Sequence, residues 1–168
     1  MNLLVFIDLQ EGFRSVELLS ILPKIKQLII NFNGIKVYSF FENEINSQFE
    51  QILQWKKFQK DSDQKLVKEL TGYPFKHFKH NEYTVLTDEL LQHIQEQKIS
   101  TLYLAGIYTD VAIVKTAMDA FDKNIKVKII GDACTSLHGK NAHKQAIDSL
   151  KHIIGRQNIV QTKELVSA

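Results

Sequence analysis

The chain has 168 residues, of which 44% are apolar, and this size and composition suit one α/β domain with a full hydrophobic core rather than a disordered chain. Its 21 lysine and arginine residues nearly balance its 19 aspartate and glutamate residues, and no basic stripe with interleaved aromatic residues gives support for nucleic-acid binding. No apolar run approaches the length of a membrane span, so we expect no membrane association.

The cysteine content and the first residues favour a cytoplasmic protein. Cys134 is the only cysteine, which excludes an internal disulfide and fits a reducing compartment. The first residues lead directly into a strand pattern, without a charged leader or a small-residue cleavage site. We therefore expect no export signal.

Short apolar runs alternate with segments of helical periodicity along the chain. The apolar runs predict strands at residues 3–7, 35–41, 75–78, 102–105, 127–130 and 158–161. The helical spacing predicts helices at residues 15–32, 49–58, 87–97, 110–121 and 142–154. Pro23 lies inside the first of these helices and predicts a kink or a fresh helix start. Because strands and helices alternate, we expect a mostly parallel sheet with helices on both faces.

The segment at residues 102–116, LYLAGIYTDVAIVKT, has the pattern of a buried strand, a tight turn and a helix start. The apolar run reaches Gly106, and Thr109 or Asp110 can cap the helix that follows. Open α/β sheets bind their ligands at such positions, outside the carboxyl end of a strand. Free N–H groups in the first helical turn also suit developing negative charge.

Residues 106–112 read Gly-Ile-Tyr-Thr-Asp-Val-Ala. This resembles the signature of the isochorismatase-like hydrolases, or cysteine hydrolases, in which Gly, two residues, Thr-Asp and one further residue precede a nucleophilic cysteine. Here the nucleophile position holds Ala112. A methyl group cannot attack a carbonyl, so the family's thiol chemistry is not available from this residue.

The resemblance extends over nearly the whole chain and implies a fold class. That fold is one three-layer α/β/α domain, here residues 1–168, with a six-stranded, mostly parallel sheet in the order 3-2-1-4-5-6. The resemblance also implies a small-molecule substrate or ligand and assembly as a homo-oligomer.

Asp8 follows the first apolar run, so it should lie at the carboxyl edge of the sheet. A partly desolvated carboxyl group there can transfer protons near neutrality, although an aspartate in this place can also simply cap the next turn. Its surroundings, residues 4–10 followed by Phe13, resemble the family's opening motif. The resemblance implies that Asp8 is the catalytic acid or base.

Lys79 lies in a stretch, residues 78–90, that is similar to the family segment carrying a catalytic lysine. A lysine beside an aspartate would hold the acid in place and stabilise negative charge at the reacting centre. Lys76 is a weaker candidate, and His80 is another if the register shifts by one residue. The structural alternative is a surface lysine in a basic loop.

The resemblance also implies a cis peptide bond at Ile107–Tyr108 and an oxyanion hole formed by the backbone N–H groups of Tyr108 and Ala112. Backbone donors are retained when a side chain changes, so they can still bind a carbonyl or carboxylate oxygen. For substrate binding we expect Phe13, Tyr83 and Ile107, with Trp55 as a further candidate for lining a pocket, although aromatic residues are more often part of a core.

The sequence predicts no metal and no cofactor. Nicotinamidases of this family carry an Asp-x-His motif after the second strand, whereas residues 40–44 here contain no histidine, and the six histidines show no ligand spacing. The first strand is followed by neither G-x-G-x-x-G nor a phosphate loop, which argues against a nucleotide or flavin binder. Cys134 is predicted to be a small buried residue, not a relocated nucleophile.

Two functions therefore stay open. In the first, the chain is a hydrolase that acts on a small molecule without a covalent intermediate, with proton transfer by Asp8 and Lys79. In the second, it is a catalytically inactive family member that binds a small ligand or a protein partner.

Overall fold

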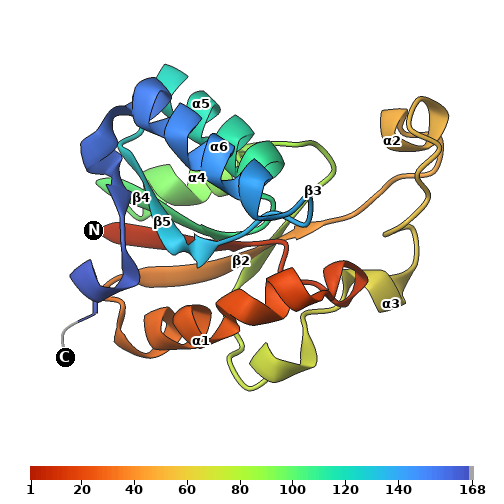
Figure 1. Ribbon diagram of the computed structural model, residues 1–168, viewed down its shortest axis with the longest axis horizontal. Coiled ribbons are helices and arrows are strands. Elements are labelled where there is room, and N and C mark those ends of the chain that lie inside the picture. The colour runs from red at the N-terminus through yellow and green to blue at the C-terminus, as the bar shows by residue number, and fades with distance from the viewer. Residues whose placement is uncertain (167–168) are drawn as a thin grey trace.

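The computed structural model describes residues 1–166 and places a six-stranded sheet at the centre of the chain (Figure 1). The strand order is β3-β2-β1-β4-β5-β6, and each neighbouring pair is parallel. The strands are β1 (Asn2–Ile7), β2 (Ile35–Phe41), β3 (His77–His80), β4 (Thr101–Gly106), β5 (Val127–Cys134) and β6 (Ile159–Val160). The predicted fold class and strand order are confirmed.

Helices cover both faces of the sheet and give the molecule three layers (Figure 1). One face is covered by α1 (Val16–Asn31), and the other by α4 (Asp88–Glu96), α5 (Val114–Asp122) and α6 (Lys140–Leu150). The connection between β2 and β3 carries the short helices α2 (Gln48–Gln51) and α3 (Asp61–Gln64). Within residues 1–166, no helix combines the length and the apolar character that a membrane crossing requires.

The central strand β1 is buried on both faces, and its side chains alternate between two cores. Leu4 and Phe6 pack in the core beneath α1, whereas Leu3, Val5 and Ile7 pack in the core beneath α4 and α5. This division follows from the two-residue period of a strand. It explains why the sequence of β1 is continuously apolar and not alternating.

The end of β4 is fixed against the end of β1. Ile7 pairs with Gly106, which has a φ of +124°. A Cβ atom at Gly106 would lie 2.2 Å from the backbone oxygen of Ile7, so only glycine fits this close approach. As a result, Asp8, which follows β1, lies at the same edge of the sheet as the turn that follows β4.

Strand β3 lies two residues later than the sequence predicts. The expected strand at residues 75–78 is instead His77–His80, and His80 pairs with Phe41 of β2. Phe75 still packs in the core, with its ring 6.5 Å from that of Phe6 and 5.6 Å from that of Tyr38. The apolar character of Phe75 therefore reflects burial and not pairing in the sheet.

Several helix ends also differ from the predicted ones. The helix predicted at residues 49–58 stops at Gln51, and α1 runs through Pro23 as one helix. A π-helical turn, Thr109–Ile113, precedes α5, and a second one, Lys151–Gly155, follows α6. The first of these turns lies beside the predicted site.

Candidate active site

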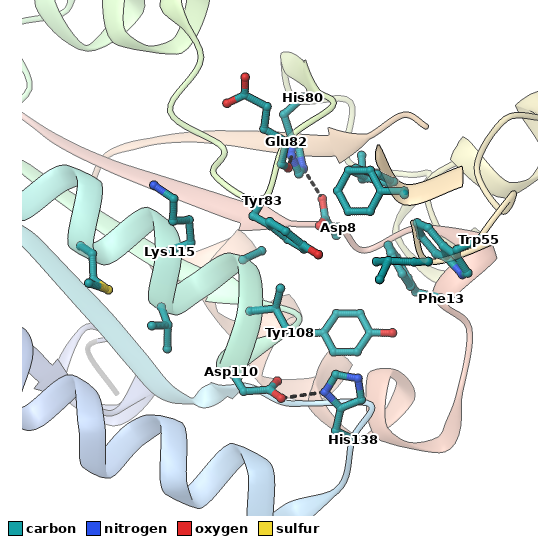
Figure 2. Close-up of a pocket in the computed structure, with 17 residues that line it drawn as sticks. Asp8, Phe13, Trp55, His80, Glu82, Tyr83, Tyr108, Asp110, Lys115 and His138 are labelled. Atoms are coloured by element: carbon teal, nitrogen blue, oxygen red, sulfur yellow. Dashed lines mark hydrogen bonds and ion pairs between the residues drawn. The ribbon is translucent and has the colours of Figure 1, made fainter. Parts of the chain in front are cut away.

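A cavity of about 630 Å³ opens at the carboxyl ends of the strands (Figure 2). Its walls come from segments that follow or end β1 to β5, which is where ligands bind in open α/β sheets. Most of the lining is apolar, and the volume suits a small molecule. The aromatic lining residues are Phe13, Phe41, Phe49, Trp55, Tyr83 and Tyr108, and the polar ones include Asp8, His80, Asp110 and His138.

Asp8 is held at the base of this cavity by contacts to the neighbouring strand. Its backbone N–H donates to the Ser39 oxygen at 2.9 Å, and its φ of +57° is uncommon for a residue with a side chain. The buried amide of Gln10, two residues later, bonds both the oxygen and the N–H of Phe41, at 2.9 and 2.8 Å. These bonds fix the turn after β1 against the end of β2.

The carboxylate of Asp8 forms a buried pair with His80. The distance from Asp8 Oδ1 to His80 Nε2 is 2.7 Å, and the two side chains are 5% and 1% exposed. His80 Nδ1 lies 2.8 Å from the backbone oxygen of Glu82. A carbonyl oxygen only accepts hydrogen bonds, so we assign a proton to Nδ1. A second proton is then shared between Nε2 and the carboxylate.

The environment of His80 favours its charged form. Burial works against an imidazolium, but the Asp8 carboxylate and the oxygen groups of Glu82 together outweigh burial and raise the pKa of His80. The hydrogen bond to the Glu82 oxygen acts in the same direction. The pair can therefore hold a transferable proton at neutral pH inside a cavity wall.

Lys79 does not meet Asp8, in contrast to the expectation from the sequence. Successive side chains of a strand point to opposite faces, and in β3 the side chain of His80 points inward while that of Lys79 points out. The Lys79 side chain is 61% exposed and pairs with Glu42 at 2.7 Å. The register of β3 thus brings His80, the alternative one residue along, to the acid.

Ala112 lies where the resemblance places the nucleophile. It is 5% exposed, sits in the π-helical turn before α5 and lines the cavity that also contains Asp8. The peptide bond between Ile107 and Tyr108 is cis, as expected. Within residues 1–166 the Tyr108 N–H donates to no acceptor, which leaves it available to a bound oxygen.

The predicted substrate contacts are placed unevenly. Phe13, Trp55 and Tyr83 line the cavity, and the rings of Phe13 and Trp55 stack at 6.4 Å. Ile107 is fully buried in the core and does not line the cavity. Cys134 is buried, and burial raises the pKa of its thiol to about 12, so it stays protonated and unreactive.

Sequence reasoning missed a second carboxylate–histidine pair in the same cavity. Asp110 Oδ2 and His138 Nδ1 are 2.7 Å apart, and both residues line the pocket (Figure 2). The sequence presents Asp110 as a possible helix cap and as part of the family signature, and His138 lies in a loop 28 residues away. No local pattern links the two. Nearby, the hydroxyl of Thr109 bonds Nδ1 of His143 at 2.7 Å.

Possible metal ligands form no cluster in the part of the chain that the structure describes. Among residues 1–166, no three histidine, cysteine, aspartate or glutamate side chains are arranged to hold a metal ion. Four of the polar side chains that line the cavity are instead paired with one another, as carboxylate with imidazole.

Comparison with curated proteins gives partial matches to isochorismatase relatives. Isochorismatase domain-containing protein 2 of Xenopus laevis is 32% identical over 71 residues, which are 42% of this chain and 35% of that protein. Enterobactin synthase component B of Escherichia coli is 31% identical over 80 residues, which are 47% of this chain and 27% of that protein. The match thus spans about a third of the length of these relatives or less.

Comparison with solved structures covers almost the whole chain. N-carbamoylsarcosine amidase from Thermoplasma acidophilum superposes with a TM-score of 0.83 at 17% identity, over 96% of each chain. Nicotinamidase PncA from Bacillus subtilis superposes with a TM-score of 0.80 at 20% identity, over 95% of this chain and 99% of that one. At these identities the likeness shows the fold.

The family is shown by a sequence model. The model of the isochorismatase domain matches residues 2–164, which include every strand, both carboxylate–histidine pairs and Ala112. This chain belongs to the isochorismatase domain family.

Proposed function

We propose that this chain is a hydrolase of a small molecule that works by acid/base chemistry and uses no cysteine nucleophile. The observation that carries the proposal is the buried Asp8–His80 pair, which lines the same cavity as Ala112. We assign the partner of Asp8 to His80, because Lys79 is outside that cavity.

The alanine at position 112 supports a reaction that does not pass through an acyl-enzyme intermediate. Ala112 has no atom that can attack a carbonyl, and Cys134 is buried in the core. Cleavage of a vinyl ether, the bond broken in isochorismate, needs a proton donor and a water molecule but no thiol. The Asp8–His80 pair can supply that proton.

Backbone donors complete the proposed site. The N–H groups of Tyr108 and Ala112 would bind an oxygen that gains negative charge during the reaction. The aromatic walls, including Phe13, Tyr83 and Trp55, would hold the apolar part of the substrate.

The test is an assay of the purified protein with isochorismate and with a panel of small amides, beside the Asp8→Asn variant. We expect turnover of at least one compound by the native chain and its loss in the variant, because an asparagine cannot transfer the proton. Turnover that is unaffected by Asp8→Asn would overturn the proposal.

A second candidate is a catalytically silent binding protein, and the specific observation in its favour is Ala112 itself. Trp55, the one tryptophan of the chain, lines the cavity and reports ligand entry by its fluorescence. Saturable quenching by a compound that is not turned over, unchanged in Asp8→Asn, would favour the binder.

We also propose that residues 1–168 form one domain that assembles as a homo-oligomer in the cytoplasm. The family likeness supports the assembly, and the single cysteine supports a reducing compartment. Light scattering after size-exclusion chromatography would decide the number of copies.

A further inference from the structure

The cavity holds two carboxylate–histidine pairs on different walls, and the proposed acid/base role uses only one of them. Figure 2 shows Asp8–His80 on one side and Asp110–His138 on the other, with Tyr108 between them. The two pairs differ in exposure: the His80 side chain is 1% exposed and that of His138 is 59% exposed. The second pair is therefore far more accessible to water than the first.

The hydrogen bond to Asp110 determines which nitrogen of His138 is free. Burial acts to raise the pKa of Asp110, but the nearby Ser136 hydroxyl and His138 imidazole outweigh it and lower that pKa, so the carboxylate is ionised. An ionised carboxylate only accepts, so Nδ1 of His138 carries the hydrogen in the 2.7 Å bond. Nε2, on the other side of the ring, makes no hydrogen bond within residues 1–166 and is therefore free to accept a proton.

The imidazole is held in place by more than the carboxylate. The backbone N–H of His138 donates to Ser136 Oγ at 3.0 Å, and the centroid of the imidazole ring lies 5.0 Å from that of the Tyr108 ring. Gly139 follows with a φ of +103°, which lets the chain turn directly into α6. The side chain is thus oriented at the cavity wall before any ligand enters.

We propose that the Asp110–His138 pair activates the water molecule that attacks the substrate. This inference rests on the proposed hydrolase function and assigns the nucleophile that Ala112 does not provide. His138 is the catalytic base, because it touches the reacting water, and Asp110 is a positioning residue that acts through His138.

The proton transfers of this step balance. His138 Nε2 takes one proton from water while the water oxygen forms a bond to the electrophilic carbon of the substrate. The bond from that carbon to its oxygen or nitrogen leaving group breaks, and the electron pair departs with the leaving group. In an amide, the leaving nitrogen takes a proton from the Asp8–His80 pair. In a vinyl ether, the pair instead gives this proton to the terminal carbon of the double bond before water adds, and the leaving oxygen takes the proton of the hydroxyl group that the water has left on the attacked carbon. His138 then returns its proton to solvent and Asp8–His80 regains one.

The contrast between the two pairs suits this division of roles. The Asp8–His80 pair is buried and the pKa of His80 is raised, so this pair retains its proton until a substrate takes it, whereas the accessible Nε2 of His138 can accept one. Sites that need both an acid and a base are commonly built from titratable groups in such unlike environments.

The test compares His138→Gln, Asp110→Asn and Asp8→Asn in the assay with isochorismate and the amide panel. His152→Gln, an exposed histidine outside the cavity, is the matched control and should behave as the native chain. We expect His138→Gln to lower kcat by about 10²–10⁴-fold with little change in KM, since it removes a base and not a binding contact. Asp110→Asn should lower kcat in the same way.

A spectroscopic readout checks the positioning role independently of turnover. In protein labelled with ¹⁵N-histidine, the His138 signal, assigned with His138→Gln, should show the Nδ1–H tautomer at neutral pH. Asp110→Asn should convert it to a mixture of tautomers. An Nε2–H tautomer in the native chain would overturn the inference.

The outcomes separate the two proposals. Loss of turnover in Asp8→Asn together with native kcat in His138→Gln would overturn the role of His138 and leave the hydrolase proposal standing. A native chain that turns over none of the compounds would overturn both, because the second rests on the first.

Discussion

At the scale of single residues, neighbouring positions of one short strand have different environments. His80 is buried against Asp8, whereas Lys79, one residue earlier, is in solvent beside Glu42. This segment contains both a lysine and a histidine that could pair with an aspartate, and its composition alone does not favour one of them as the partner. The pairing of His80 with Phe41 decides between them, since a shift of one residue would reverse both side chains.

Lys79→Gln should have little effect on either activity or stability. The Lys79–Glu42 pair is exposed, and such surface pairs contribute about 1 kcal/mol or less. Steady-state kinetics and urea unfolding of the variant, beside the native chain, give both quantities. A large loss of turnover with normal stability would return the catalytic role to Lys79.

His80→Gln should remove a pH-dependent part of the free energy of unfolding. The folded-state pKa of His80 is raised above the ordinary 6.5, so the stabilisation is fully present below that value and is lost as pH rises through the folded pKa. The stability difference between the native chain and the variant should therefore shrink as pH increases. Urea unfolding from slightly acidic to alkaline pH measures it, with His152→Gln as control. A difference that is constant with pH would contradict this account.

At the scale of elements, the site depends on how two strands end and one helix begins. β1 and β4 terminate at the paired residues Ile7 and Gly106, and the chain then enters the π-helical turn that carries Ala112. A helix start has unpaired N–H groups, which favour negative charge nearby. Ala112 therefore lies in an electrostatic environment suited to an anion, although its own side chain is inert.

Gly106→Ala should destabilise the fold strongly. The added Cβ would lie 2.2 Å from the Ile7 oxygen, in a backbone conformation that side chains disfavour, and strain of this kind costs about 1–3 kcal/mol or more. Gly72→Ala is the matched control, because a Cβ at Gly72 meets nothing within 4 Å. Thermal and urea unfolding of the two variants should differ clearly; equal stability would show that the ends of β1 and β4 are not so tightly fixed.

Ala112→Cys should create a thiol that is more reactive than an ordinary exposed one. A thiol in the first turn of a helix has a lowered pKa, while burial keeps that of Cys134 at about 12. We expect iodoacetamide at neutral pH to modify residue 112 faster than a cysteine placed on the surface of α1 by Ser20→Cys, as followed by mass spectrometry. Modification of Cys134 alone in the Ala112→Cys variant would show that the site has been placed wrongly.

At the scale of the whole molecule, one sheet edge collects the functional groups. Asp8, His80, Tyr108 and His138 follow or end four different strands, and they meet because parallel strands all end at the same edge. The connection between β2 and β3 adds Phe49 and Trp55 to the aromatic walls. The cavity is thus a product of topology, and no single segment of the chain contains it.

Local patterns in the sequence predict most of the strands, the family, and the places of Asp8 and Ala112, and the family resemblance adds the strand order. Apart from the strand order, each of these rests on a local signal: an apolar run, a polar residue at its end, or a motif within a few residues. Three placements became evident only in the folded chain: His80 and not Lys79 contacts Asp8, Ile107 lies in the core, and Asp110 meets His138. These depend on strand register and on contacts between distant segments, and a one-residue shift in register exchanges the buried and exposed faces of a strand without any change in composition.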